Sequence, residues 1–261
     1  MDLTFLGTGT SQGVPVIACH CATCSSDDSR DKRLRSALLV EHAGKRFVID
    51  TGPDFRQQML REHVEHLDFV LLTHEHKDHL AGMDDIRSFN FAQHMSMHIY
   101  ANQRTCKAVR NEFAYAFKHH KYPGVPQLSL YEVGDEAFEE QGIRILPVQV
   151  LHMELPVLGY RIADMAYITD ASYISDKELA KLQHLKVLVL DVLRKEKHYS
   201  HFCLEEGLAL VEKLRPERTY FTHIAHSMGR YAEVEPTLPP NVHLAYDRLK
   251  VHIEDEKKQS T

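Results

Sequence analysis

The sequence predicts an α/β fold in one domain that spans residues 1–261. The length of 261 residues, with 43% hydrophobic and 26% charged residues, is typical of a globular chain that can build one large core. Short apolar runs of strand type alternate with stretches of helical periodicity along most of the chain. Several of these runs end in histidine or aspartate, which indicates chemistry at the strand ends.

The first half of the chain mixes both kinds of element. Apolar runs predict strands at residues 3–6, 36–41, 46–50, 68–73 and 97–100. Helical spacing predicts helices at residues 55–64, 81–91 and 104–117. Asp54 is expected to cap the first helix, because an aspartate side chain accepts hydrogen bonds from the free N–H groups of a helix start.

The second half begins with successive strands and then alternates. Strands are expected at residues 128–133, 143–150, 157–162, 165–169, 186–190 and 218–222, with two final strands at 244–246 and 249–253. Helices are expected at residues 176–184 and 204–214.

The pair His119 and His120 is interpreted as surface, and Cys106 and Cys203 as buried thiols.

Composition excludes several classes of protein. The formal net charge of -6 argues against broad electrostatic binding to nucleic acid, and the basic clusters at residues 30–35 and 118–121 are interpreted as solvated surface. Residues 1–7 lack the features of a signal peptide, and no apolar run approaches the length of a membrane span. We therefore expect a cytoplasmic protein.

The stretch from residue 71 to residue 80 carries the strongest chemical signal. His74 and His76 are two residues apart in an extended segment, so their side chains point the same way and can share one metal ion. Asp78 and His79 belong to the turn that follows and can reach a second ion. The alternative is a solvated polar loop, which four residues of metal-binding type within six positions disfavour.

Other residues of ligand type also follow predicted strands. His152, Asp170 and His223 each come directly after an apolar run, and His226 follows three residues later. Taken alone, His152 or Asp170 could equally be a cap or a surface turn residue.

The irregular segment at residues 14–33 contains three of the five cysteines, Cys19, Cys21 and Cys24. Loops of this length in a compact domain usually need an internal tie, and three thiolates provide three ligands of a tetrahedral structural zinc. His20 is the near candidate for the fourth ligand, but a distant residue is more plausible. The preceding glycine-rich loop at residues 7–13 lacks a nucleotide-binding fingerprint.

The ordered set His74-x-His76-x-Asp78-His79, then His152, Asp170 and His223, resembles the metallo-β-lactamase superfamily. The resemblance implies an αββα sandwich of two mixed β-sheets flanked by helices, with a dinuclear metal site at one edge. By this analogy His74, His76 and His152 hold one ion. Asp78, His79 and His223 hold the other, and Asp170 bridges both.

Within the superfamily, the chain resembles the cyclic phosphodiesterases of the carbon–phosphorus lyase pathway, the PhnP family. The likeness rests on Gly7-Thr8-Gly9 and Gln12-Gly13-Val14-Pro15, followed by the Cys-x-Cys-x-x-Cys cluster. It implies that His226 completes a structural zinc site with the three cysteines. It also implies that His201 is a general acid; His198 is a rival, but His201 directly precedes the helix expected at 204–214.

The resemblance implies a metal-dependent phosphodiesterase that hydrolyses a small phosphodiester, linear or cyclic. Two divalent ions would share a hydroxide by lowering the pKa of water towards about 7, with Asp78 and His201 as catalytic residues. The nitrogen and oxygen ligands suit zinc, manganese or iron, and the thiolates suit one structural zinc. We expect no extended nucleic acid and no membrane as partners, and a homodimer is compatible with the sequence.

Three other readings remain open. A transfer-RNA 3′-processing nuclease shares these ligands, but its substrate-binding arm lies between the third ligand histidine and the bridging aspartate, where this chain has only seventeen residues. A non-catalytic member, such as one in cofactor biosynthesis, would be marked by degenerate ligands, and none is seen. A carboxyl-ester, thioester or lactam hydrolase would use the same hydroxide on a carbonyl carbon.

Overall fold

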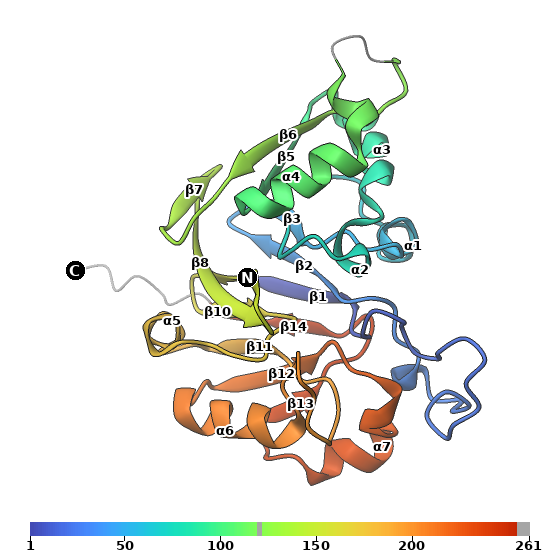
Figure 1. Cartoon of the computed structure of the whole chain (residues 1–261), viewed down its shortest axis with the longest axis vertical. Coiled ribbons are helices and arrows are strands. Elements are labelled where there is room, and N and C mark those ends of the chain that lie inside the picture. Colours follow the sequence, from blue (N-terminus) through green and yellow to red (C-terminus); the bar gives the residue numbers. More distant parts are fainter. Residues whose placement is uncertain (119–121, 255–261) are drawn as a thin grey trace.

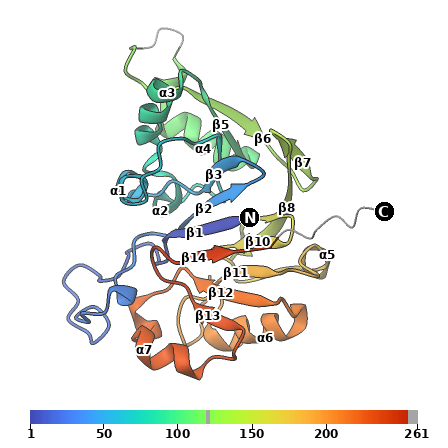
Figure 2. The same cartoon turned by 180° about the vertical axis from the view of Figure 1, so that it is seen from behind.

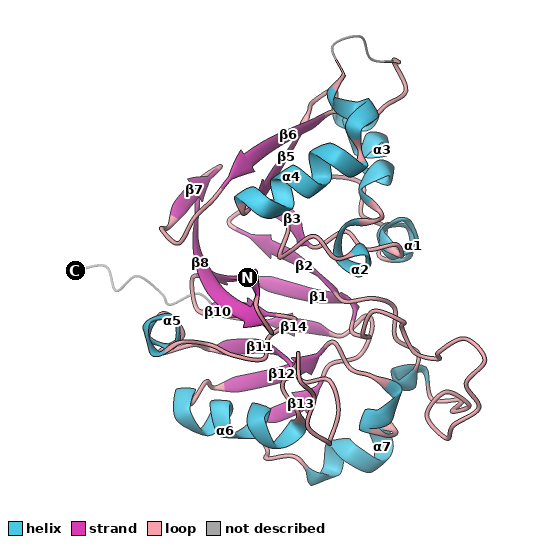
Figure 3. Ribbon diagram, viewed as in Figure 1, coloured by secondary structure: helices cyan, strands magenta, loops and turns pink. Residues whose placement is uncertain are grey.

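The structure is a computed structural model that describes residues 1–118 and 122–254. Within these residues, two seven-stranded β-sheets stack face to face, with helices on both outer faces (Figures 1 and 3). The αββα sandwich expected from the resemblance is therefore confirmed. No helix among the described residues has the length and apolar character needed to cross a bilayer.

The strands of the first sheet lie in the order β14-β1-β2-β3-β4-β5-β6. In chain order their bounds are β1 Asp2–Gly7, β2 Ala37–His42, β3 Lys45–Ile49, β4 Phe69–Leu71, β5 Met97–Ala101, β6 Leu128–Glu132 and β14 Lys250–His252. Strands β14, β1, β2 and β3 pair antiparallel, whereas β3 to β6 pair parallel.

The strands of the second sheet lie in the order β13-β12-β11-β10-β9-β8-β7. Their bounds are β7 Phe138–Glu140, β8 Ile143–His152, β9 Leu155–Ile162, β10 Met165–Ile168, β11 Val187–Asp191, β12 Arg218–Thr222 and β13 Val242–Leu244. Strands β7 to β10 pair antiparallel, and β10 to β13 pair parallel. Both sheets are therefore mixed.

The helices divide between the two outer faces. Their bounds are α1 Phe55–Arg61, α2 Lys77–Leu80, α3 Arg87–Gln93, α4 Gln103–Glu112, α5 Asp176–Ala180, α6 Leu204–Leu214 and α7 Tyr231–Val234. Helices α1 to α4 lie on the first sheet and α5 to α7 on the second (Figure 1). Seen from either side, the irregular segment 14–33 projects from the flank of the sandwich on which α7 lies (Figures 1 and 2).

Alternation along the strands produces the three-layered core. In β4, Phe69 and Leu71 point between the sheets, while Val70 packs under the helices of the first sheet. In β11, Val189 points between the sheets and Leu188 packs under the helices of the second sheet. Because successive residues of a strand face opposite sides, one apolar run serves two hydrophobic layers.

Two hydrogen bonds tie the end of β4 to the second sheet. The backbone N–H of Leu158 donates to the carbonyl of Thr73 at 3.0 Å, and the buried Tyr160 hydroxyl donates to the carbonyl of Leu72 at 2.6 Å. These bonds hold the residues just before His74 against β9. The histidine-rich turn is thereby fixed between the two sheets.

Several helix predictions are wrong in detail. The helix expected at 81–91 begins four residues earlier as α2, pauses at Gly82, and continues through a 3₁₀ turn at Met83–Ile86 into α3. A Cβ atom at Gly82 would lie 2.2 Å from the carbonyl oxygen of Gly52, so glycine is required by this close approach. The helices expected at 55–64 and 176–184 end earlier, at Arg61 and Ala180, and the helix expected at 104–117 is α-helical to Glu112 and continues as a 3₁₀ turn at Ala114–Phe117.

The expected cap at Asp54 is also wrong. Asp54 precedes α1, but its carboxylate makes no capping hydrogen bond and instead accepts from the backbone N–H of Arg35 at 2.8 Å. The Arg35 guanidinium lies 3.3 Å away, which makes this competing contact more favourable than a cap.

The prediction for the basic cluster at residues 30–35 is wrong for Arg33. This side chain is buried, and its Nη1 donates to Thr8 Oγ1 at 2.9 Å and to the carbonyl of Ala245. Most of the cluster at 118–121, with His119 and His120, lies outside the described residues. Cys106 and Cys203 are buried thiols, as expected.

The final strands differ from the prediction. The strand expected at 244–246 is β13, which ends at Leu244, and the next strand, β14, joins the other sheet. Asp247 fixes this crossing, since its carboxylate accepts from Thr8 Oγ1 and from the backbone N–H of Leu34, both at 2.9 Å. The short elements β7 and α7 were not expected.

Candidate metal centre

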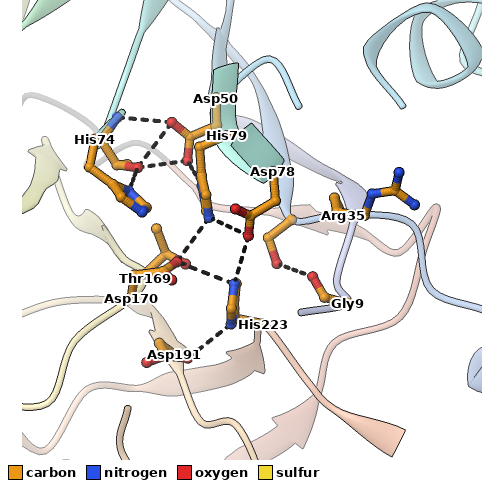
Figure 4. A network of polar contacts seen from close by, with 12 residues as sticks. Gly9, Arg35, Asp50, His74, Asp78, His79, Thr169, Asp170, Asp191 and His223 are labelled. Atoms are coloured by element: carbon orange, nitrogen blue, oxygen red, sulfur yellow. Dashed lines mark hydrogen bonds and ion pairs between the residues drawn. The ribbon is translucent and has the colours of Figure 1, made fainter. Parts of the chain in front are cut away.

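The predicted ligands gather where strands of the two sheets end, and Figure 4 shows His74, Asp78, His79, Asp170 and His223 among them. His74 follows β4, His76 to His79 form the start of α2, and His152 ends β8. Asp170 and His223 follow β10 and β12, respectively. Strand ends of this kind place side chains from distant parts of the chain at one edge.

Asp170 is common to three of the groups that these residues form. Within each group the possible ligand atoms lie within 4.8 Å of one another. The groups are Asp78, His79, Asp170 and His223; His74, His76 and Asp170; and His152, Asp170 and His201. All seven predicted ligands are thus brought together, with Asp170 at their centre.

The shortest contacts surround the Asp170 carboxylate. Its Oδ2 lies 3.0 Å from His79 Nε2 and 3.3 Å from His223 Nε2. Asp78 Oδ2 lies 3.1 Å from His79 Nε2 and 3.5 Å from His223 Nε2 (Figure 4). On the other side, the His76 ring lies 4.5 Å from that of His74 and 5.3 Å from that of His152.

Ring nitrogens that make no hydrogen bond indicate that these residues fit a metal site. Among the described residues, Nε2 of His74, His79 and His223 is buried and makes no hydrogen bond of acceptable geometry, although carboxylate oxygens lie close to His79 and His223. A buried polar atom without a partner is costly, and a cation would satisfy all three nitrogens. Asp170 and His223 also have positive φ angles, 49° and 58°, a strain that concentrates at functional sites.

Two carboxylates that sequence reasoning missed hold the imidazole rings. Asp50, directly after β3, accepts a hydrogen bond from His79 Nδ1 at 2.7 Å and from Thr73 Oγ1 at 2.9 Å. Asp191, the last residue of β11, accepts from His201 Nδ1 at 3.1 Å. Both are fully buried. Such partners set the tautomer of a ring so that its other nitrogen faces the metal.

The signal for Asp50 and Asp191 was present in the sequence. Each is an aspartate at the end of an apolar strand, as Asp170 is. The backbone of Asp50 has a φ of 68°, and its carboxylate also accepts from the backbone N–H of Thr73 at 2.8 Å. No short motif connects Asp50 or Asp191 with the histidines that they contact.

The charges of the centre are strongly coupled. Burial by itself would raise the pKa of Asp170, but His223 and His79 hold that pKa well below its usual range. Burial opposes the charged form of His79, yet Asp78, Asp170 and Asp50 raise its pKa well above the ordinary value. The pKa of His74 is lowered well below its ordinary value by burial and by the neighbouring His79. Buried carboxylates therefore require positive charge here.

His201 and His198, the two candidates for the acid, differ in position. The His201 ring lies 4.6 Å from that of His152, and its Nε2 lies 3.9 Å from Asp170 Oδ1. Burial lowers the pKa of His201, but Asp191 outweighs this and raises it to about 9. The His198 ring lies 5.4 Å from that of His201, and burial lowers its pKa.

The cysteine cluster meets His226 as the resemblance implied. His226 Nδ1 lies 3.3 Å from the Sγ atoms of Cys19 and Cys21 and 3.5 Å from that of Cys24. Tetrahedral zinc with bonds of 2.0–2.3 Å has ligands separated by about 3.5 Å, so these four residues fit the ion. His20 is exposed and outside the group.

The thiols of the cluster differ in their pKa. A hydrogen bond from the backbone N–H of Cys24 lowers the pKa of Cys21 to about 6, and the His226 ring contributes. Burial raises the pKa of Cys24 to about 11. Cys21 is thus available as a thiolate at neutral pH, the form in which cysteine binds zinc.

Comparison with known proteins agrees with this fold. Residues 45–224 match the family described as the beta-lactamase superfamily domain, which is more than half of the chain. The chain therefore belongs to the beta-lactamase superfamily. Within it the chain is PhnP-like: a crystal structure of a diphosphatase from the PhnP family is 41% identical, with a TM-score of 0.90 and coverage of 96% of each chain.

Two curated relatives match in sequence. An octanoyltransferase of Porphyromonas gingivalis is 39% identical over 260 residues, 98% of this chain and 52% of that protein. A ribonuclease Z of Bradyrhizobium diazoefficiens is 41% identical over 88 residues, 33% of this chain and 24% of that protein. The chain thus spans about half, or less, of the length of these relatives.

Proposed function

We propose that the chain is a metal-dependent hydrolase of a small phosphoric diester, linear or cyclic. The observation that carries the proposal is the convergence of seven ligand-type side chains on Asp170, with His201 beside them. The 41% identity to a PhnP-family diphosphatase supports phosphorus chemistry.

The chain offers two sets of ligands for divalent cations. We assign His74, His76 and His152 to one ion and Asp78, His79 and His223 to the other, with Asp170 serving both. When bound, zinc, manganese or iron at these positions supplies Lewis acidity and lowers the pKa of a water molecule so that it is nucleophilic at neutral pH. Cys19, Cys21, Cys24 and His226 hold a separate structural zinc that ties segment 14–33 to the chain after β12.

Side chains and one backbone carbonyl of the chain orient the histidines, and His201 supplies the proton. Asp50 holds His79 through its Nδ1, and the Ser200 carbonyl holds His152 by a hydrogen bond of 2.8 Å from Nδ1. Asp191 keeps the proton on Nδ1 of His201, while His201 Nε2 points to the side of Asp170. In its imidazolium form, His201 donates its Nε2 proton to the departing alcohol oxygen, a step worth about 10²- to 10⁴-fold.

A second candidate is hydrolysis of a diphosphate bond, which the likeness to the PhnP-family diphosphatase favours. A phosphate leaving group is far less basic than an alkoxide, so its departure depends less on a general acid. The effect of a His201→Ala substitution therefore separates the two candidates. A large loss favours the diester, and a small loss favours the diphosphate.

The geometry gives less support to the other activities. Between His152 and Asp170 the chain contains the turn after β8, then β9 and β10, which leaves no room for an inserted arm of the transfer-RNA processing type. The octanoyltransferase that matches is about twice as long as this chain, so its acyl transfer is not assigned to this chain.

The experiment is a substrate screen combined with elemental analysis of protein purified without chelator. The panel contains bis-p-nitrophenyl phosphate, a nucleoside 2′,3′-cyclic phosphate, a dinucleoside diphosphate, an acyl thioester and a lactam. We expect tightly held zinc, further exchangeable metal, and turnover of the phosphate esters. Turnover of the thioester or the lactam alone would contradict the proposal.

A further inference from the structure

Three large, exposed apolar residues have backbones that lie near His152 in the structure. Met153, Tyr173 and Tyr199 have exposed fractions of 53%, 55% and 75%. Single exposed apolar residues are common, and Leu60, Phe91 and Tyr122 are exposed on other segments. What distinguishes Met153, Tyr173 and Tyr199 is their position relative to one candidate ligand.

Backbone hydrogen bonds place each of the three residues near His152 or near the adjacent Leu151. Met153 follows His152 directly, and its backbone N–H donates to Ser172 Oγ at 3.0 Å. The carbonyl of Tyr173 accepts from the backbone N–H of Leu151 at 3.0 Å. Tyr199 precedes Ser200, whose carbonyl accepts from His152 Nδ1. Three separate segments thus bring the backbones of these residues close to one histidine.

This is also the open side of the candidate metal centre. His74, His79 and His223 are buried, whereas His76 is exposed and His152 is half-buried. A small substrate must therefore approach from the side of His76 and His152. Groups of that substrate that extend beyond the phosphate will meet the residues around His152.

Tyr199 lies on the loop that carries the candidate acid. Its ring stacks on that of His198, with centroids 4.4 Å apart and planes inclined by 27°. The His198 ring in turn lies 5.4 Å from that of His201. Since His201 faces the departing alcohol, Tyr199 lies on the alcohol's side of the reaction.

We propose that Met153, Tyr173 and Tyr199 form a subsite for a planar aromatic group, such as a nucleobase, on the alcohol part of the substrate. This inference rests on the proposed function and adds a substrate class to it. Tyrosine faces bind flat aromatic groups by stacking, and methionine sulfur packs favourably on aromatic rings. Base–aromatic stacking tolerates any base, so the subsite selects a ring rather than a base sequence.

The test compares two substrates whose leaving alcohols are chemically alike. Adenosine 5′-(methyl phosphate) and ribose 5-(methyl phosphate) share the 5′ ester and differ in the base. We expect the wild-type enzyme to prefer the adenosine ester in kcat/KM by about tenfold or more, the effect of one stacking contact. Tyr199→Ala and Tyr173→Ala are expected to remove most of this preference, and Tyr199→Phe to keep it.

Tyr122→Ala is the matched control, because Tyr122 is equally exposed but lies on the loop before the edge strand β6. It should keep the full preference. An unchanged preference in both Tyr199→Ala and Tyr173→Ala would overturn the subsite, as would the absence of any preference in the wild type.

A binding measurement tests the subsite independently of whether the enzyme hydrolyses a diester. Adenosine 5′-monophosphate and ribose 5-phosphate are titrated into the metal-loaded wild type and the Tyr199→Ala variant by calorimetry. Tighter binding of the adenosine compound that depends on Tyr199 supports the subsite even if neither diester is hydrolysed, in which case only the proposed function fails. Equal binding of both compounds to the wild type contradicts the subsite.

Discussion

The Asp191 carboxylate accepts a hydrogen bond of 3.1 Å from His201 Nδ1, and both side chains are buried. Its other oxygen lies 3.6 Å from His223 Nδ1. One carboxylate from β11 therefore contacts both the proposed acid and a proposed metal ligand. The positions of the proposed acid and of the proposed ligand His223 are linked through this aspartate.

Replacing Asp191 with asparagine is expected to lower kcat for an alkyl phosphodiester about 100-fold, because His201 loses the charge that keeps it protonated and oriented. A p-nitrophenyl ester should be affected much less, since its leaving group needs little protonation. Combining Asp191→Asn with His201→Ala should cost hardly more than His201→Ala alone. Additive losses, or loss of bound metal in the single variant, would show that Asp191 acts through His223 instead.

Asp50 is expected to determine metal affinity through His79. The change Asp50→Asn removes the charge that faces His79 Nδ1 at 2.7 Å and should weaken binding of one catalytic ion by about 10- to 100-fold. Competition with a fluorescent chelator measures this change. Asp176→Asn is the control, because that carboxylate is almost fully exposed and pairs with Lys213. Equal affinities in the two variants would be incompatible with the assignment of Asp50.

The structural zinc is expected to hold segment 14–33. Cys24→Ser or His226→Ala should release one zinc per chain and make this segment more sensitive to protease, while the catalytic ions remain. Cys203→Ser provides the control, since Cys203 stands at the N-cap of α6, where serine is well accepted. Zinc content that is unchanged in both cluster variants would refute the site.

The contact between Glu140 of β7 and two residues of β5 predicts a dependence of stability on pH. Glu140 accepts hydrogen bonds from Tyr100 and, at 2.9 Å, from His98. Burial on its own would raise the pKa of Glu140, but these hydrogen bonds lower it overall. Stabilisation by a carboxylate with a lowered pKa is complete above its unfolded pKa, about 4.3 for glutamate, and is lost as the pH falls through its folded pKa.

The variant Glu140→Gln should accordingly lower the free energy of unfolding by about 1 kcal/mol at pH 7, and the difference from wild type should shrink below about pH 4. Urea unfolding of metal-free protein over this range measures both values. Glu139→Gln is the control, because the neighbouring Glu139 points outward. A difference that grows on acidification would contradict a lowered pKa for Glu140 in the folded protein.

The strand ends that carry ligands were predictable because alternation and apolar runs report directly on buried strands. The strand before His74 is present as β4, although it ends at Leu71, and Asp78 and His79 lie in α2 and not in the expected turn. The seven proposed ligands come from distant parts of the chain, and among sequence observations only the resemblance connects them. Local pattern alone left His152 and Asp170 ambiguous.

Other features depend on contacts that no local pattern contains. Asp54 had the residue type of a helix cap, but Arg35, nineteen residues earlier, engages its carboxylate. Asp50 and Asp191 accept hydrogen bonds from histidines 29 and 10 residues away along the chain. The break at Gly82 arises from close approach to Gly52, a tertiary constraint. Sequence periodicity predicts which side of an element is buried but not which distant residue meets it.

The central claim is that the residues around Asp170 bind two cations that act in phosphodiester hydrolysis. The most direct measurement is turnover of bis-p-nitrophenyl phosphate by chelator-treated protein while manganese or zinc is returned in known amounts. We predict no turnover without metal and a rise that reaches its plateau at two ions per chain beyond the thiolate-bound zinc. Full turnover by metal-free protein, or two bound ions with no turnover of any phosphate ester, would contradict it.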